Sequence, residues 1–213
     1  MSYLIEEENS CPYCLHPNTV EVWAAVNVKE DPELKDLLIG GEMNMSECAA
    51  CHRIFYAENF VLYHDPDQEL MGFVYPLSYR LEEQRWRQKT LDDFQKTQGL
   101  AEPKDRLPYL PVTFFGLDEL VSLVEHETEM SIQSEILETL AQQHGLGVRR
   151  LRPFVARSQK LPVVLPVADG PTEPKRALME GILSLRKLND RLSVYNEVYD
   201  RLAGHPEEEV VLG

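Results

Sequence analysis

The sequence CPYC at residues 11–14 and the sequence CAAC at residues 48–51 decide how the first third of this chain folds. In a CxxC turn both sulfur atoms can face one point, so two such turns supply four thiolates. Four thiolates form the tetrahedral ligand set that Zn²⁺ prefers, at zinc–sulfur distances of ~2.3 Å. The chain has 4 cysteines, and the two pairs use all of them. The sequence therefore predicts a zinc site made by Cys11, Cys14, Cys48 and Cys51.

Three other uses of the cysteines compete with zinc. Disulfides suit an oxidising compartment, whereas we expect this chain in the cytoplasm, where thiols stay reduced. A redox CxxC pair normally opens a helix, and neither pair is followed by a helical pattern. Iron held as in a rubredoxin uses the same four sulfurs, and this alternative stays open. Four protein ligands leave no position for water or substrate, so we expect a structural metal. His16 and His52 adjoin the two turns and are expected at the surface rather than as ligands.

The region around the cysteines is predicted to be a small sheet. Residues 19–28 alternate apolar and polar side chains, which predicts a strand. Residues 31–40 predict a short helix, with Asp31 as its cap, Pro32 in its first turn and Gly40 at its end. Further strands are expected in four short segments, the last two joined by the turn-forming sequence DPDQ: residues 42–47, 54–56, 60–64 and 70–75. Region 1–76 is therefore predicted as an antiparallel, zinc-ribbon-like sheet that metal binding stabilises.

The chain becomes helical after residue 76. A helix is expected from Ser78, as its cap, to about Gln98, and three prolines then break regular structure over residues 101–113. Apolar residues repeat at helical spacing from Leu117, and a second helix follows that ends at His144-Gly145. Residues 77–146 are therefore predicted to be a helical continuation of the same domain.

Residues 147–172 contain four prolines and five basic residues against one acidic residue. The apolar sequence LPVVLPV is interrupted by proline, which suits an edge strand or an extended segment. We expect an ordinary connection packed on the core, with an arm that docks on a partner as the alternative. The basic residues are expected to lie on a solvated strand or loop: Arg149, Arg150, Arg152, Arg157 and Lys160.

Residues 173–204 are predicted to form one long C-terminal helix, followed by an acidic, solvated tail at 205–213. Six apolar residues of this helix follow a spacing of 3-4-3-4-3: Leu185, Leu188, Leu192, Tyr195, Tyr199 and Leu202. This spacing is that of a coiled-coil seam, but it is short. Two interpretations stay open, a helix folded back on its own domain and a dimer seam.

The predicted fold class of the whole chain is α+β.

The charge of the chain is strongly negative. The formal net charge is −15, and residues 1–75 hold 3 Lys/Arg against 14 Asp/Glu. An acidic surface repels phosphate, so direct nucleic-acid binding is not expected, and a basic partner protein fits better. No segment approaches the ~20 apolar residues that span a bilayer. The acidic start does not resemble a signal peptide, which leads us to expect a cytoplasmic protein without a membrane segment.

Several of these segments together resemble the CpXC-domain proteins of bacteria. The resemblance rests on CPYC at 11–14, DPELKDLLIGGEMNMSECAAC at 31–51 and YHDPDQELMGFVYP at 63–76. It is close over residues 9–76 and looser to about residue 146. The second cysteine motif has Ala49 where the family name implies proline, but the thiolate geometry does not require a proline. The resemblance implies a presumed metal-binding domain with the four cysteines as ligands, and it implies no activity.

The sequence predicts no catalytic site. His64 and Asp65 are neighbours in a predicted strand, where adjacent side chains point to opposite faces, so Asp65 is expected to open the turn rather than assist catalysis. Phosphate-loop, dinucleotide, HExxH and GxSxG motifs do not occur. We therefore expect a non-enzymatic zinc protein that acts as a protein–protein interaction or regulatory module, with another protein as its partner or with itself through the last helix. The alternative is a nucleic-acid- or transcription-associated zinc ribbon.

Overall fold

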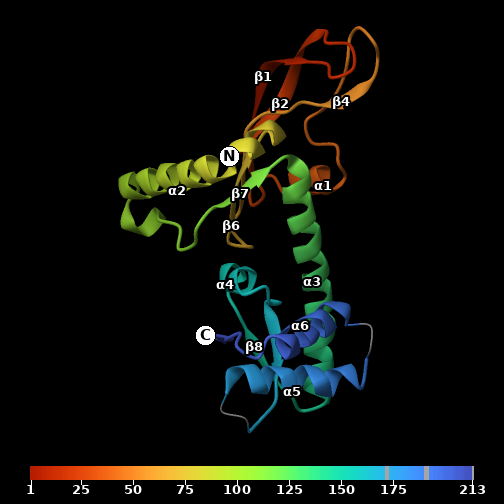
Figure 1. The fold of residues 1–213 in the computed structure, drawn as a ribbon, viewed down its shortest axis with the longest axis vertical. Coiled ribbons are helices and arrows are strands. Elements are labelled where there is room, and N and C mark those ends of the chain that lie inside the picture. Colours follow the sequence, from red (N-terminus) through yellow and green to blue (C-terminus); the bar gives the residue numbers. More distant parts are fainter. Residues whose placement is uncertain (171–172, 190–191, 213) are drawn as a thin grey trace. The chain divides into compact units, whose positions relative to one another are not determined.

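A computed structural model describes residues 1–170, 173–189 and 192–212 (Figure 1). Strands and helices are both abundant, which confirms the predicted α+β class. The chain divides into two compact units, Met1–Glu125 and His126–Gly213, and the sheet with the cysteine pairs belongs to the first. No helix in the described ranges has the length and apolar character needed to cross a membrane.

A five-stranded sheet forms the centre of the first unit. Its strand order is β1-β2-β5-β6-β7, and the strands are β1 (Tyr3–Ser10), β2 (Pro17–Asn27), β5 (Val61–Asp65), β6 (Leu70–Tyr75) and β7 (Val112–Phe115). The β1–β2 and β5–β6 pairs are antiparallel, but β2–β5 and β6–β7 are parallel. The prediction of an antiparallel sheet over residues 1–76 was therefore wrong for the β2–β5 pair. Strand β7, which pairs with β6, was not predicted, because the prolines of residues 101–113 were expected to break regular structure. Long crossovers join both parallel pairs, as parallel strands require.

The crossover from β2 to β5 contains the predicted helix and the second cysteine pair. Helix α1 (Glu33–Ile39) has no side-chain cap, so the expected cap on Asp31 was wrong. The chain turns after it at Gly41, whose φ of 70° favours glycine. Strands β3 (Met45–Glu47) and β4 (Ile54–Tyr56) then form a separate two-stranded sheet. The long gap between the cysteine pairs is therefore filled by β2, α1 and β3.

Sequence reasoning missed strand β1. Its first residues are apolar and the next are three consecutive glutamates, so the strand lacks the apolar–polar alternation that marks a half-buried strand. Most of its side chains are exposed, because β1 lies at an edge of the sheet and pairs only with β2. The pairing spans the whole strand, from Tyr3 opposite Ala25 to Ser10 opposite Pro17.

Helices pack on both faces of the central sheet. Helix α2 (Glu83–Leu100) follows a 3₁₀ segment, η1 (Leu77–Glu82), which confirms the predicted helix although Ser78 does not cap it. The Tyr75 hydroxyl hydrogen-bonds Thr90 of α2. The opposite face of β6 contributes Val74 to a core that also contains side chains from α1 and from the helix that starts at Leu117: Leu34, Leu38, Leu120 and Val124. A short 3₁₀ turn, η2 (Pro103–Asp105), lies between α2 and β7.

Helix α3 (Leu117–Gln143) is the longest helix in the described ranges and has 27 residues. It is one continuous helix over the two helical patterns of the sequence. It ends as predicted, because Gly145 has a φ of 68° and Leu146 N–H donates to the Ala141 carbonyl. This pattern is a Schellman C-cap.

After α3, the described residues of the second unit form a pair of strands and three helices. Strands β8 (Gly147–Arg150) and β9 (Val164–Val167) pair antiparallel, and helix α4 (Pro153–Ser158) lies in the segment that connects them. The predicted single helix over 173–204 was wrong, because this stretch holds two helices, α5 (Pro174–Arg186) and α6 (Ser193–Gly204). Leu188 to Leu192 lies between them, and residues 190–191 are outside the described residues.

The apolar residues of the proposed seam mostly face the core of their own unit. Four of the six are buried there: Leu185, Leu192, Tyr195 and Leu202. Tyr199 is partly buried against the same core, and Leu188 is 49% exposed. Because the two helices fold against each other, the spacing that resembles a coiled coil belongs to a helical hairpin. The fold-back interpretation accounts for these side chains.

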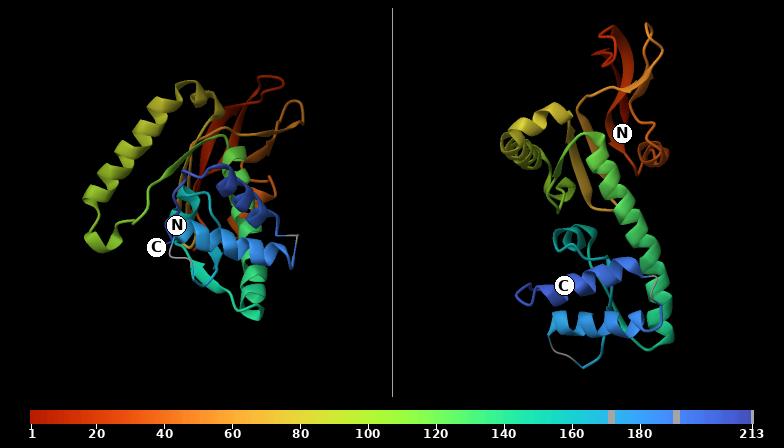
Figure 2. Two further views of the ribbon diagram at one scale, coloured as in Figure 1. Left: turned by 60° about the horizontal axis from the view of Figure 1, so that its bottom comes forward. Right: turned by 45° about the vertical axis from the view of Figure 1, so that its right-hand side comes forward.

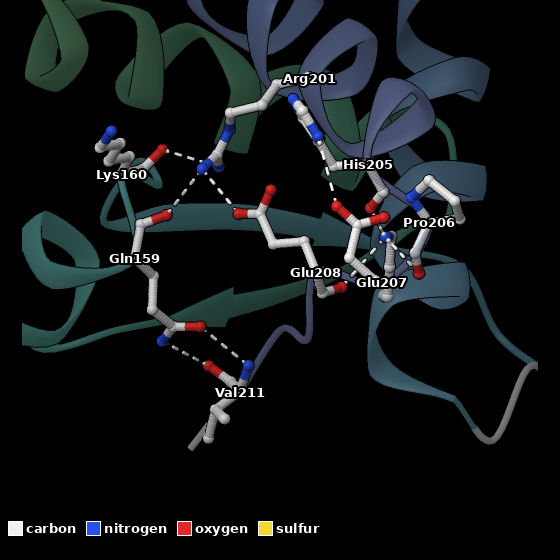
Figure 3. A network of polar contacts seen from close by, with 9 residues as sticks. Gln159, Lys160, Arg201, His205, Pro206, Glu207, Glu208 and Val211 are labelled. Atoms are coloured by element: carbon white, nitrogen blue, oxygen red, sulfur yellow. Dashed lines mark hydrogen bonds and ion pairs between the residues drawn. The ribbon is translucent and has the colours of Figure 1, made fainter.

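The acidic tail is held against the rest of the second unit by hydrogen bonds and an ion pair (Figure 3). The Arg201 guanidinium donates to the carbonyls of Gln159 and Lys160 and pairs with Glu208 at 2.7 Å. The Gln159 amide makes two hydrogen bonds to the backbone of Val211. The buried Lys175 donates to three carbonyls at the end of α6 and in the tail: His205, Pro206 and Glu208. The expectation of a solvated tail holds for Glu207 and Glu209, which are exposed, but it was wrong for Glu208, which is partly buried, and for Val210, which is buried.

We expect Leu192→Asp to destabilise the second unit by about 3 kcal/mol or more, because it places a charge in an apolar core. The Leu192 side chain is 3% exposed. Leu188→Asp is the matched control and should change the unfolding free energy by less than about 0.5 kcal/mol. Urea unfolding measures both. Equal effects of the two substitutions would contradict the helical-hairpin core.

Candidate metal centre

The two cysteine pairs occupy the tips of two hairpins. The first lies between β1 and β2, and the second lies between β3 and β4. Figures 1 and 2 show these two hairpins side by side at one end of the first unit. The hairpin strands therefore fix the direction in which each pair of thiols points.

Both tips have the same backbone structure. In the first, Cys11 N–H donates to the His16 carbonyl and Leu15 N–H donates to the Cys11 carbonyl. In the second, the same bonds run from Cys48 to Arg53 and from His52 to Cys48. The matching residues Leu15 and His52 have φ values of 60° and 57°. This left-handed conformation closes each turn so that both sulfurs of a pair point to the same side.

The four thiols converge on one point. The sulfur atoms of all four cysteines lie within 4.8 Å of one another. Two of these contacts join different hairpins, with Cys11 Sγ–Cys51 Sγ at 3.7 Å and Cys14 Sγ–Cys48 Sγ at 3.6 Å. A tetrahedron with ~2.3 Å metal–sulfur bonds has edges of about 3.8 Å, so these separations fit four ligands of one ion. All four thiols are free, with no disulfide among them.

The site is buried on one side and open on the other. Cys11 and Cys48 are fully buried, whereas Cys14 is exposed. The buried pair packs in a small core of its own with four side chains from β2, β4 and the residue after β4: Val20, Val22, Phe55 and Ala57. Since a core of this size stabilises little by itself, an ion would add the missing cross-link between the hairpins.

A buried asparagine, which sequence reasoning missed, links the two tips. Asn18 at the start of β2 donates to the His16 carbonyl at 2.8 Å and contacts Cys48 Sγ at 3.7 Å. Its side-chain oxygen accepts a hydrogen bond from Ala49 N–H at 2.9 Å. One side chain thus joins the first turn, the second turn and a thiol. Its position four residues after Cys14 is the only sequence signal, and it does not distinguish Asn18 from other polar loop residues.

Hydrogen bonds to sulfur make the thiols unequal. Burial opposes ionisation of Cys48, but backbone N–H groups of Cys51 and Ala50 and the Cys14 thiol lower its pKa to about 6. At Cys14 a backbone hydrogen bond involving His16 favours the thiolate, but desolvation and the neighbouring thiols together raise its pKa to about 12. In the metal-free site the interacting thiols therefore titrate together, and the hydrogen bonds to sulfur favour the thiolate at Cys48 over the thiolate at Cys14.

The neighbouring histidines do not join the cluster. His52 Nδ1 lies 2.8 Å from Glu47 Oε1, and both side chains are largely exposed. His16 is exposed and contributes its backbone carbonyl to the first turn. Within the described part of the chain, the four cysteines are the group of potential ligands whose donor atoms lie close enough for one ion.

His64 and Asp65 have separate structural partners. The Asp65 carboxylate accepts from Gln68 N–H, as expected for a turn-opening residue, and pairs with Lys35 at 3.2 Å. His64 Nε2 lies 2.9 Å from the Tyr109 hydroxyl, and burial lowers the pKa of His64. The expected role of Asp65 as the residue that opens the turn is confirmed, and His64 is hydrogen-bonded to Tyr109.

Two arginines of the basic segment pair with glutamates of α3. Arg157 makes two bonds to Glu127, at 2.6 and 3.1 Å, and both side chains are mostly buried. Arg150 pairs with Glu138. The expectation of a fully solvated basic run was therefore wrong for Arg157, and the charge available to a phosphate backbone is reduced.

The comparisons with known proteins concern the part of the chain that holds this site. A family model described as "CpXC protein" matches residues 10–140, which is more than half of the chain and includes both cysteine pairs. No curated protein and no solved structure matched. The family match confirms the resemblance found in the sequence.

We expect Asn18→Ala to destabilise the metal-loaded protein by about 1–3 kcal/mol, because it removes the hydrogen bonds that the buried Asn18 side chain makes to Ala49 N–H, to the His16 carbonyl and to Cys48 Sγ. The metal should also dissociate faster. Asn9→Ala, opposite Asn18 on β1, is the matched control, with an expected change below about 0.5 kcal/mol. Urea unfolding and metal transfer to a chelator measure the two effects. Equal metal release from both variants would refute the linking role of Asn18.

Metal affinity should rise with pH between about 6.5 and 8.5, by about tenfold per pH unit or more. Cys14, with a pKa near 12, stays protonated over this range in the metal-free protein and must lose its proton to bind. Cys48, with a pKa near 6, contributes no proton in the upper part of the range. Competition with a chelator of known pH dependence measures the slope. An affinity independent of pH would contradict thiolate ligation by Cys14.

Proposed function

Since this chain belongs to the CpXC family, we propose that it is a non-enzymatic zinc protein whose metal is structural and whose role is to bind or regulate another protein. The observation that carries the proposal is the convergence of four thiols at two hairpin tips. An ion there would be coordinated by protein on all sides.

The choice of zinc rests on ligand chemistry. Zn²⁺ favours tetrahedral thiolate ligands and has no redox chemistry of its own. Iron binds the same set of sulfurs and is the alternative that metal analysis tests. When bound, zinc would act as a cross-link between the β1–β2 and β3–β4 hairpins. With four protein ligands it has no open position at which a substrate or water would be activated. A reducing compartment such as the cytoplasm would suit this role, because the ligands must remain thiols.

The proposal of a protein partner rests on charge and on the location of the ionisable groups. The net charge of −15 favours basic partners over nucleic acid. His64 and Asp65, the most suggestive acid–base pair of the sequence, are held by Tyr109 and Lys35. The transcription-associated alternative remains a second outcome of the test, through binding to a protein of that machinery or to DNA.

Native mass spectrometry of the purified full chain, followed by affinity purification from its host, tests the proposal. We expect one zinc ion per chain and a stoichiometric protein partner that is lost when Cys11→Ser and Cys48→Ser are combined. Ser184→Ala in the second unit serves as a control that retains metal and partner. A site filled with iron would overturn the zinc assignment. Salt-sensitive binding to DNA in a mobility-shift assay, with no protein partner, would favour the alternative.

A further inference from the structure

The two edges of the central sheet differ in how their backbone groups are covered. At the β7 edge, Arg87 donates to the Thr113 carbonyl and Arg80 donates to the Phe115 carbonyl, each at 3.3 Å. These two guanidinium groups occupy acceptors that a further strand would need. The β7 edge, which is also only 4 residues long, is therefore closed to strand addition.

The β1 edge is longer and is not covered in this way. Strand β1 has 8 residues, and after an irregularity between Tyr3 and Leu4 its pairing with β2 is regular to Ser10. Figure 1 shows β1 as the outer strand of its hairpin. In the parts of the chain that the structure describes, no side chain hydrogen-bonds to the backbone of Leu4 to Ser10. Every second residue of this stretch therefore presents its N–H and C=O outward.

The side chains of this edge carry one sign of charge. Glu6 and Glu8 point to the same face as Glu21 of β2, and Glu6 lies directly opposite Glu21. Like charges in directly opposed positions destabilise a sheet. Residues 1–28 contain no lysine or arginine, and no ion pair joins these three carboxylates to a cation in the described ranges. A partner that supplies cations here would relieve this repulsion.

The residues that precede the glutamates in the strand are apolar and exposed. Leu4 and Ile5 are 44% and 39% exposed. The edge thus begins with an apolar stretch, continues with three glutamates and ends with the polar residues Asn9 and Ser10. An antiparallel partner strand that matches it would begin with basic residues and end with apolar ones.

We propose that the β1 edge, from Leu4 to Ser10, receives an extended segment of a basic partner protein as an added antiparallel strand. Backbone hydrogen bonds would provide affinity, and pairing of Lys or Arg with Glu6 and Glu8 would provide selectivity. A second copy of this chain is the weaker occupant, because β1 against β1 brings glutamates together. This inference deepens the proposed interaction function and rests on it.

The test uses a ten-residue peptide with alternating lysine and threonine in its first half and alternating valine and threonine in its second half. Binding to the zinc-loaded full chain is followed by amide chemical shifts and hydrogen exchange in NMR. We expect shift changes and slower exchange for the outward amides of Leu4 to Ser10. The same peptide with glutamate in place of lysine should bind at least tenfold more weakly.

Paired variants separate strand addition from general attraction to an acidic protein. Glu6→Lys with Glu8→Lys should weaken binding of the basic peptide at least tenfold. Asp67→Lys with Glu125→Lys changes the net charge equally at exposed positions outside this edge and should leave binding within about twofold. Hydrogen exchange also shows whether each variant keeps the β1–β2 pairing.

Three results would overturn the inference: no binding at millimolar peptide, binding that leaves the β1 amides unchanged, or equal weakening by both variant pairs. The host partner separates this proposal from the proposed function. If Glu6→Lys with Glu8→Lys retains a stoichiometric partner in affinity purification, the interaction function stands and the β1 edge is not its site. If the wild-type chain has no partner, the proposed function fails.

Discussion

The convergence of four sulfur atoms from two hairpins is the constraint on which the first unit depends. Each hairpin tip places two thiols by the same hydrogen-bonded turn, and thiols of the two tips approach to 3.6 and 3.7 Å. The core beneath them is small, so the attachment of one hairpin to the other relies on this point. Asn18 supports the same junction through both turns. A bound ion would turn the junction into a cross-link between segments far apart in the sequence.

The position of the site in the fold explains why a structural role suits the metal. Strand β2 belongs to the β1–β2 hairpin at one end and to the central sheet at the other, where it pairs with β5. Fixing the tips therefore also orients β2 in the sheet and holds β1 against it. The outer edge of β1 is open because β1 is the first strand in the order of the sheet and pairs with β2 alone. The cysteine site and the proposed interaction edge thus lie on the same β1–β2 hairpin.

Sequence patterns predicted the parts of the fold that local chemistry determines. The four cysteines, helix α1, the β5–β6 hairpin and the C-cap at Gly145 all depend on residue types at fixed spacing. The parallel pairs could not be predicted in the same way, because strand direction depends on crossovers whose course is set by tertiary packing. Strand β1 was not predicted, because its apolar and polar residues do not alternate along the edge of the sheet. The linking role of Asn18 was not predicted, because its hydrogen-bond partners come from two turns that are far apart in the sequence.

The C-terminal region shows the limit of periodicity. A 3-4-3-4-3 apolar spacing is common to a coiled-coil seam and to two short helices that share one core, and the break between α5 and α6 decides between them. The tail was expected to be solvated on composition alone. Lys175 donates to its backbone carbonyls, Arg201 pairs with the Glu208 carboxylate, and Gln159 hydrogen-bonds the backbone of Val211, and composition reveals none of these contacts.

X-ray absorption spectroscopy at the zinc edge, on freshly purified protein, tests the central claim most directly. The account predicts a single zinc environment of four sulfur ligands at ~2.3 Å. A shell that contains nitrogen or oxygen ligands, or protein without stoichiometric metal whose four thiols all react freely in the folded state, would contradict it.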